Sequence, residues 1–304
     1  MTIVSLLPSA TEIVCALGLA DQLAGVSHEC DFPAEIVGRP VLTAPKIDPS
    51  ADSASIDAAV RRLVADGLSV YRIDAERLAQ LQPDLIVTQD QCEVCAVSYK
   101  DVVDATSALL QKPATIVSLR PSRLDDIFGD IERVADAADR SVAGRELTAR
   151  LRARLDGLRA GATRVHSRPR VACIEWIEPL MAAGNWVPEL VELGGGVYEL
   201  APPGGHSPTL SWDDLVAYAP DVVVIMPCGF RLEQTRRELE RLTGHPAWPR
   251  LPAVQNQRVY AVDGNAYFNR PGPRIVDSAE LLAGLIQPGL FATKMPPGSY
   301  LRVS

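Results

Sequence analysis

One histidine and three cysteines in the first third of the chain have side chains that bind soft metal ions: His28, Cys30, Cys92 and Cys95. Thiolate sulfur and imidazole nitrogen suit a tetrahedral site for a thiophilic metal ion. Cys92 and Cys95 form a Cys-x-x-Cys pair, but the sequence has no second such pair, so the pattern is less specific than a zinc ribbon. Two alternatives stay open. The cysteines could be reduced thiols packed behind a binding site. Cys92 and Cys95 could also form a redox pair, but such pairs lie at a helix start that lowers the thiol pKa, and the Ala-Val-Ser after Cys95 is only a weak helix start.

The pair His28 and Cys30 and the pair Cys92 and Cys95 each follow a segment that has the composition of a buried strand. Residues 23–27 precede His28, and the apolar run 84–88 precedes Cys92. A third strand, at residues 3–7, leads into a tight turn. Because ligands of open parallel sheets lie outside the carboxyl ends of the strands, we expect these loops to share one edge of a first lobe. The residues expected to contact a ligand there are Pro8, Ser9, His28, Glu29, Cys30, Asp31, Gln89, Gln91 and Cys92.

A second set of candidate ligand-binding residues follows strands in the other half of the chain. Trp176 and Trp186 flank a loop after a strand predicted at 170–176, where an indole ring could stack on a flat ligand. Cys228 follows the apolar run 221–225. The alternatives are core packing for the two tryptophans and a small buried residue for the cysteine. The full set in this half is Trp176, Trp186, Cys228, Phe230, Phe268 and Arg270.

The elements that must position these residues alternate between strands and helices. Helices are predicted at 56–68 and 74–81, and a strand at 115–118. Ser9 and Glu12 have the spacing of a capping box, which predicts a helix that begins at Ser9. The sequence Pro-Asp followed by an apolar run occurs at 83–88 and again at 220–225, so the two halves resemble variations on one βα scheme. Two helices, at 122–138 and 141–160, separate them, and four leucines of the second helix recur on one face: Leu147, Leu151, Leu155 and Leu158.

These patterns predict an α/β fold with two Rossmann-like lobes. Each lobe has a parallel sheet, one long connector helix joins the lobes, and a ligand cleft lies between them. The expected domains are an N-terminal lobe at 1–120, a connector region at 121–161, a C-terminal lobe at 162–287 and a tail at 288–304.

The composition restricts the function. The chain has 304 residues and a net charge of −8, and this acidic balance argues against nucleic acid as a partner. No apolar run is long enough to span a bilayer, so we expect no membrane insertion, and we expect a monomer. The N-terminus lacks the features of a secretory signal, which predicts a cytoplasmic protein, or a periplasmic one if a leader has been removed. We find no phosphate loop, nucleophile elbow or His-Glu-x-x-His motif, and therefore expect no enzyme.

At this point several motifs resemble one known family, the class III (helical-backbone) substrate-binding proteins that serve ABC importers of cobalamin, haem and siderophores. The similarity extends over roughly residues 1–287. The loops at 27–33 and 88–92 are similar to a cobalamin-binding branch, and within it to a leaderless, cytosolic-type subgroup. The other segments that carry the resemblance are 3–6, 8–12, 17–18, 185–195, 245–254, 258–260 and 273–274.

The resemblance implies non-catalytic binding of a corrinoid, such as cobalamin, or of a related tetrapyrrole in the cleft. The protein would be a carrier or an importer component, with an ABC permease as partner in the second case. A thiolate or imidazole could then bind the cobalt or iron of the ligand, instead of a free thiophilic metal ion. The chain departs from the cobalamin-binding relatives in one respect: all four tryptophans lie in the second half, so the first lobe offers a polar, thiol-rich wall.

Overall fold

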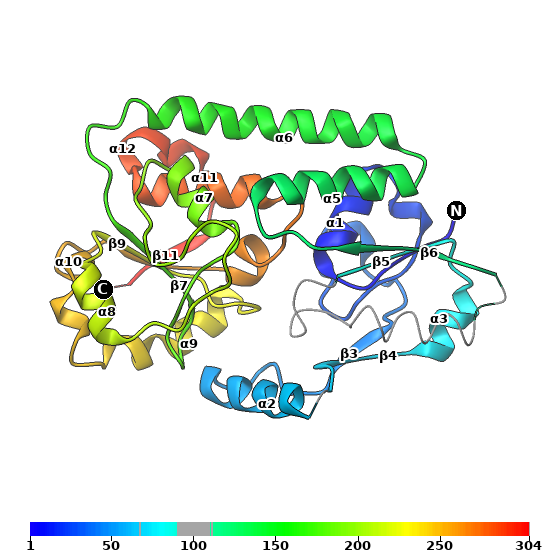
Figure 1. The fold of residues 1–304 in the computed structure, drawn as a ribbon, viewed down its shortest axis with the longest axis horizontal. Coiled ribbons are helices and arrows are strands. Elements are labelled where there is room, and N and C mark those ends of the chain that lie inside the picture. Colours follow the sequence, from blue (N-terminus) through cyan, green and yellow to red (C-terminus); the bar gives the residue numbers. More distant parts are fainter. Residues whose placement is uncertain (67, 90–109, 111, 304) are drawn as a thin grey trace. The chain divides into compact units, whose positions relative to one another are not determined.

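The computed structural model describes residues 1–66, 68–89, 110 and 112–303. The chain divides into two compact units. The first unit comprises Met1–Ala51, Ala58–Pro121 and Asp125–Arg150, and the second comprises Asp52–Asp57, Ser122–Leu124 and Leu151–Ser304. Figure 1 labels the helices and strands and colours the chain from blue at the N-terminus to red at the C-terminus.

The first unit is built on a parallel sheet with the strand order β2-β1-β5-β6. Ile3 and Ser5 of β1 pair with Leu85 and Val87 of β5, and β6 continues the sheet on the other side of β5. A separate antiparallel pair, β3 with β4, precedes α3. The strands are β1 Ile3–Ser5, β2 Leu23–Gly25, β3 Thr43–Pro45, β4 Tyr71–Ile73, β5 Leu85–Gln89 and β6 Thr115–Leu119. The helices in this part of the sequence are α1 Pro8–Ala16, α2 Ser53–Ala65, α3 Ala75–Leu81, α5 Leu124–Ala137 and α6 Ser141–Ala162.

The second unit has a five-stranded sheet with the order β11-β10-β9-β7-β8. Its three central strands are parallel, and the two outer ones, β8 and β11, are antiparallel to their neighbours. The strands are β7 Val171–Trp176, β8 Met181–Ala182, β9 Val222–Ile225, β10 Val259–Val262 and β11 Tyr300–Arg302. The helices are α7 Val187–Leu193, α8 Trp212–Tyr218, α9 Leu232–Thr243, α10 Pro252–Gln255, α11 Ile275–Ile286 and α12 Pro288–Phe291. The predicted α/β fold, with a parallel sheet in each of two lobes, is confirmed.

The apolar runs of the sequence form the cores of the two units. All four residues of β9 are fully buried, as expected for a strand covered on both faces. In the first unit, Val4 of β1 and Ile86 of β5 pack with Leu42 and Leu78. The four leucines of α6 predicted to share one face are all buried: Leu147, Leu151, Leu155 and Leu158.

The two Pro-Asp sequences have the same structural role. The carboxylate of Asp84 accepts a hydrogen bond from the backbone N–H of Thr2, and the carboxylate of Asp221 accepts one from that of Arg170. The backbone N–H of each aspartate in turn donates to the carbonyl of the same partner. Each aspartate thus fixes the start of a neighbouring strand, which supports the similarity of the two halves seen in the sequence.

Three local expectations were wrong or incomplete. Ser9 does not cap α1: the N-cap is Leu7, Pro8 occupies the first turn and no side chain accepts a capping hydrogen bond. Proline suits the first helical position because it has no N–H to satisfy, and this moves the helix start ahead of Ser9. The second helix begins at Ser53 rather than at residue 56. The C-terminal residues include a strand, β11, that closes one edge of the second sheet.

In the part of the chain that is described, every helix is too short or too polar to cross a membrane.

Candidate functional site

In the first unit, the loops after β1 and β2 are joined by side-chain hydrogen bonds. The hydroxyl of Thr11 donates to Oγ of Ser5 at 2.8 Å and lies 3.1 Å from the sulfur of Cys30. Thr11 belongs to α1, and Cys30 follows β2. The sequence motif at residues 8–12 and the loop at 28–33 are therefore neighbours, as predicted from their positions after two adjacent strands.

The β3–β4 pair holds the side chains of His28 and Glu29. Nδ1 of His28 lies 2.7 Å from Oγ1 of Thr43, and the same oxygen accepts a hydrogen bond from the backbone N–H of His28 at 3.0 Å. The hydroxyl of Tyr71 donates to Oε1 of Glu29 at 3.0 Å, and the rings of Tyr71 and His28 are 5.3 Å apart. Burial lowers the pKa of His28 below its ordinary value, which favours the neutral imidazole at neutral pH.

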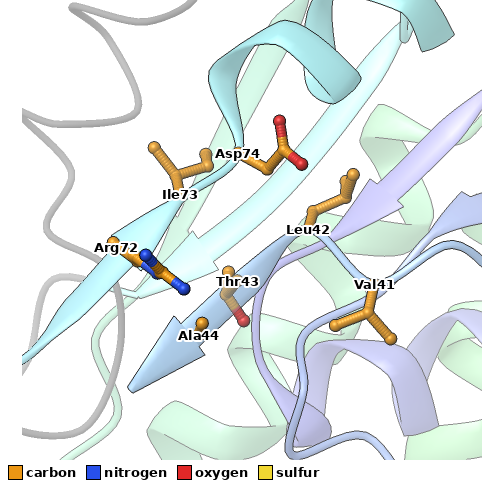
Figure 2. A pocket seen from close by; sticks show the side chains of 7 residues that line it. All are labelled: Val41, Leu42, Thr43, Ala44, Arg72, Ile73 and Asp74. Carbon is orange, nitrogen blue, oxygen red and sulfur yellow. The ribbon is translucent and has the colours of Figure 1, made fainter. Parts of the chain in front are cut away.

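A pocket of about 420 Å³ lies along the β3–β4 pair. Figure 2 shows the lining side chains, which come from the paired strands β3 and β4 and from Val41, Leu42 and Asp74 next to them in the sequence. Thr43, which orients His28, lines this pocket, and Arg72 and Asp74 supply its charged groups. The volume is within the range of pockets for small ligands. Because Thr43, Arg72 and Asp74 line the pocket, it can accept a polar group.

The other first-lobe candidates differ in their exposure. Ser9 and Gln89 are buried, Pro8 is partly buried and Asp31 is exposed. Gln91, Cys92 and Cys95 lie outside the described residues. Within the described ranges, no group of three or more His, Cys, Asp or Glu side chains could hold a metal ion. The predicted site made of His28, Cys30, Cys92 and Cys95 therefore remains a prediction.

Two other cysteines, Cys15 in α1 and Cys173 in β7, have the surroundings of core residues. Cys173 is fully buried in β7, and burial raises the pKa of its thiol. Burial also raises the pKa of the Cys15 thiol in α1, to about 11. Because the reactive form of cysteine is the thiolate, both side chains are inert near neutral pH.

In the second unit, Trp176 is a partly buried aromatic residue at the carboxyl end of β7. Its ring meets the ring of buried Phe230 edge to face, with centroids 5.1 Å apart. Its Nε1 donates to the carbonyl of Glu178. Cys228 lies beside this pair, because its N–H donates to the carbonyl of Glu175 at 3.0 Å. The loops after β7 and β9 thus place one partly exposed indole on a buried aromatic support.

The remaining second-lobe candidates are more deeply buried. Trp186 is 7% exposed, and its Nε1 donates to the carbonyl of Phe268 at 3.0 Å. Phe268 is 1% exposed and Arg270 is 2% exposed. The hydrogen bond between Trp186 and Phe268 connects the loop before α7 with the loop after β10. Direct contact of these three residues with a ligand remains a prediction.

Comparison with known proteins decides the family. A sequence model of the family described as periplasmic binding protein matches residues 3–266. The chain belongs to the periplasmic binding protein family. This match confirms the family that the motifs predicted, whereas the cobalamin-binding branch remains a prediction.

This periplasmic binding protein is similar to one known lipoprotein in sequence and to several solved structures in fold. It is 22% identical to an uncharacterized ABC transporter substrate-binding lipoprotein of Bacillus subtilis, over 95% of this chain and 81% of that protein. Its fold is similar to the periplasmic vitamin B12 binding protein of Vibrio cholerae, with a TM-score of 0.66, 24% identity and 94% and 96% of the two chains covered. It is also similar to a periplasmic haem-binding protein from Roseiflexus, with a TM-score of 0.70, 21% identity and coverage of 95% and 98%.

In this periplasmic binding protein, sequence reasoning missed a carboxyl group at the same edge as Trp176. Oε1 of Glu175 accepts a hydrogen bond from the hydroxyl of Ser207 at 2.8 Å, and that hydroxyl accepts one from the N–H of Gly184. Burial raises the pKa of Glu175, although the hydrogen bonds from Ser207 and Gly184 oppose the rise. One signal was present in the sequence: Glu175 is the single charged residue within the otherwise apolar strand β7.

We expect the Glu175→Gln substitution to change how the stability of this periplasmic binding protein depends on pH. Because the pKa of Glu175 is raised on folding, the folded protein binds this proton more tightly than the unfolded chain. The stabilisation is therefore complete below the ordinary glutamate pKa of about 4.3 and is lost as the pH rises through the folded-state value. As the pH rises over this range, the free energy of unfolding of the wild type should fall relative to that of the Glu175→Gln variant. Urea unfolding at a series of pH values measures the difference, and parallel profiles would contradict the prediction.

Proposed function

We propose that this periplasmic binding protein binds a corrinoid, such as cobalamin, or a related tetrapyrrole, and catalyses no reaction on it. The observation that carries the proposal is the partly exposed ring of Trp176 on its buried support, Phe230. A macrocycle is a flat ligand with a large apolar face, and stacking on an indole buries that face. The edge after β7 and β9 supplies such a surface.

The first unit supplies polar groups that complement the other part of such a ligand. A corrinoid carries amide side chains around its ring, and amides both donate and accept hydrogen bonds. The loop with His28 and Glu29 and the nearby Tyr71 hydroxyl offer donors and acceptors for them. The cleft between the lobes, where both surfaces would meet one ligand, remains a prediction from the sequence.

The printed descriptions of the relatives are consistent with this ligand class. One solved relative is described as binding vitamin B12 and another as binding haem, and both ligands are metal-containing tetrapyrroles. The Bacillus relative is described as an ABC transporter substrate-binding lipoprotein. We accordingly propose that the protein is an importer component with an ABC permease as partner, or a carrier of the same ligand in the cytoplasm. Cell fractionation separates these two roles, because they place the protein in different compartments.

The proposal is tested by the visible absorption spectrum of the purified protein. Separate samples are incubated with hydroxocobalamin and with haemin, and free ligand is removed by gel filtration. Retained corrinoid at one equivalent per chain supports the proposal, and retained haemin alone narrows the ligand to haem. A colourless protein in both samples would overturn it. Stoichiometric metal in a colourless protein would instead favour a metal-ion or metal-chelate site that uses His28, Cys30, Cys92 and Cys95.

A further inference from the structure

A carboxyl group at the edge of the second sheet supports a more specific inference about the ligand. We infer that the carboxylate of Glu175 selects for a neutral amide on the rim of the tetrapyrrole and against a carboxylate at the same place. Glu175 would then be a specificity-determining residue that favours a corrinoid over haem. This inference rests on the proposed function, because it concerns the substituents of the proposed ligand.

The first step of the argument is the backbone geometry at Glu175. Ile174 of β7 pairs with Ala182 of β8, and Trp176 pairs with Met181, so Glu175 has no partner in this ladder, as in a β-bulge. A bulge re-aims the side chain of the extra residue, and bulges are frequent beside active sites. Glu175 lies at the carboxyl end of β7, where ligands of parallel sheets bind. The bulge therefore places a carboxyl group at the same edge as the Trp176 ring.

The second step is that this carboxyl group is held in one position. Oε1 of Glu175 accepts a hydrogen bond from the Ser207 hydroxyl at 2.8 Å, and Oγ of Ser207 accepts one from the N–H of Gly184 at 3.0 Å. The segment that carries Ser207 packs closely on Gly184, since a Cβ there would lie 2.4 Å from the carbonyl oxygen of Gly205. The N–H of Asn185 donates to that carbonyl at 2.6 Å. A group fixed in this way loses little conformational freedom when a ligand binds.

The third step concerns access and charge. Glu175 is partly exposed, although burial of its carboxyl group raises the pKa. Among the described residues, no Lys or Arg side chain is paired with this carboxyl group. A carboxylate has about four lone-pair sites, so Glu175 can accept a further hydrogen bond besides the one from Ser207. A partly desolvated carboxylate without a cation is stabilised by an N–H donor and destabilised by a second carboxylate.

The fourth step compares the rims of the two kinds of macrocycle. The side chains around a corrin end in amides, whereas haem carries propionate carboxylates. An amide N–H can donate to Glu175, but a propionate facing Glu175 would bring two negative charges together. Specificity arises from an unfavourable contact with the wrong ligand as well as from a favourable contact with the right one. Glu175 supplies both contacts with a single group.

The experiment uses the full chain at about pH 8 and ligands that differ in one group. Mild acid hydrolysis of hydroxocobalamin converts a peripheral amide into a carboxylate, and the separated monocarboxylate isomers retain the rest of the ligand. Equilibrium dialysis gives the Kd of each isomer relative to that of hydroxocobalamin, so ionisation of the water on cobalt cancels in the ratio. For the wild type, we expect at least one isomer to bind about 10–100-fold more weakly, as for the loss of a hydrogen bond to a charged group.

Two variants show whether this loss of affinity arises from Glu175. Glu175→Gln keeps the shape of the side chain and an acceptor for Ser207 but removes the charge, so the affected isomer should regain most of its affinity. Glu178→Gln is the matched control, because Glu178 is an exposed glutamate after the same strand, and it contacts Trp176 through its backbone carbonyl. This variant should discriminate against the affected isomer as the wild type does.

The possible results separate the inference from the proposed function. The inference is overturned, and the proposed function stands, if the wild type binds every isomer as tightly as hydroxocobalamin. The same holds if the discrimination persists in Glu175→Gln or is lost in Glu178→Gln. Retention of haemin alone also overturns the inference, and a protein that retains neither corrinoid nor haemin removes both proposals.

A further variant decides if Glu175→Gln fails to fold by circular dichroism. Ser207→Ala leaves the charge of Glu175 in place but removes the hydroxyl that holds its carboxyl group. Weaker discrimination between the affected isomer and hydroxocobalamin in this variant supports the inference, because a loosened carboxylate can turn away from the ligand. Discrimination equal to that of the wild type contradicts it.

Discussion

The Trp176→Ala variant is expected to bind the proposed corrinoid ligand about thirtyfold more weakly than the wild type. Removal of an aromatic side chain that anchors a ligand costs about 2 kcal/mol or more, and each 1.4 kcal/mol corresponds to about tenfold in Kd. Trp176 is suited to this role because its ring is partly exposed and rests on the buried ring of Phe230. Equilibrium dialysis against hydroxocobalamin measures the change.

Two further variants show whether the effect arises from stacking. Trp176→Phe keeps an aromatic face beside Phe230 and should recover most of the affinity. Tyr300→Ala removes a partly buried aromatic ring of the same unit that packs against Tyr260 on the β10–β11 pair, and should leave the affinity unchanged. An unchanged Kd in the Trp176→Ala variant would mean that the macrocycle does not lie on this ring.

The Gly264→Ala variant is expected to lose stability and ligand affinity together. A Cβ at position 264 would lie 2.2 Å from the carbonyl oxygen of Pro227 and 2.8 Å from that of Met226. Both obstacles are backbone atoms, so one of the two loops must move. Overpacking of this kind costs about 1–3 kcal/mol. The movement also strains the hydrogen bond from the N–H of Asn265 to the carbonyl of Phe230, and thus displaces the aromatic support of the site.

Gly157→Ala is the matched control for this substitution. Gly157 lies within α6, and a Cβ there would meet no atom within 4 Å. Because alanine favours a helix over glycine by about 1 kcal/mol, this variant should be as stable as the wild type or more so. Urea unfolding gives both free energies, and dialysis gives both affinities. Equal stability of the two alanine variants would show that the loops at 226–230 and 264–268 adjust without cost.

Much of the fold could be predicted because its signals are local. The leucine spacing of α6 and the apolar run of β9 specify a helix face and a buried strand without reference to other segments. The start of α1 shows the limit of such signals. The Ser9–Glu12 spacing fits a capping box, but the conformational preference of Pro8 decides the helix start. The short β3–β4 pair was not predicted, because its two strands lie far apart in sequence and three residues carry little periodicity.

The candidate site was less predictable, because its contacts join distant segments. The sequence identifies His28 as a residue capable of metal binding, but Thr43 and Tyr71 are 15 and 43 positions away and have no motif in common with it. Only the pairing of β3 with β4 brings them to the same imidazole. Glu175 shows the opposite case, because a lone carboxyl in an apolar strand could have been recognised from the sequence.

The parallel pairing of β1 with β5 also has a consequence for the speed of folding. Ile3 pairs directly with Leu85, although the two residues lie far apart in the sequence, because β1 and β5 are neighbours in the sheet. A chain whose contacts join such distant residues closes long loops before any contact stabilises them, and it folds more slowly than a helical bundle of similar size. Apolar strands of the first unit therefore stay exposed for longer during refolding. When the protein is refolded by dilution from denaturant, aggregation should compete with folding most strongly at that stage.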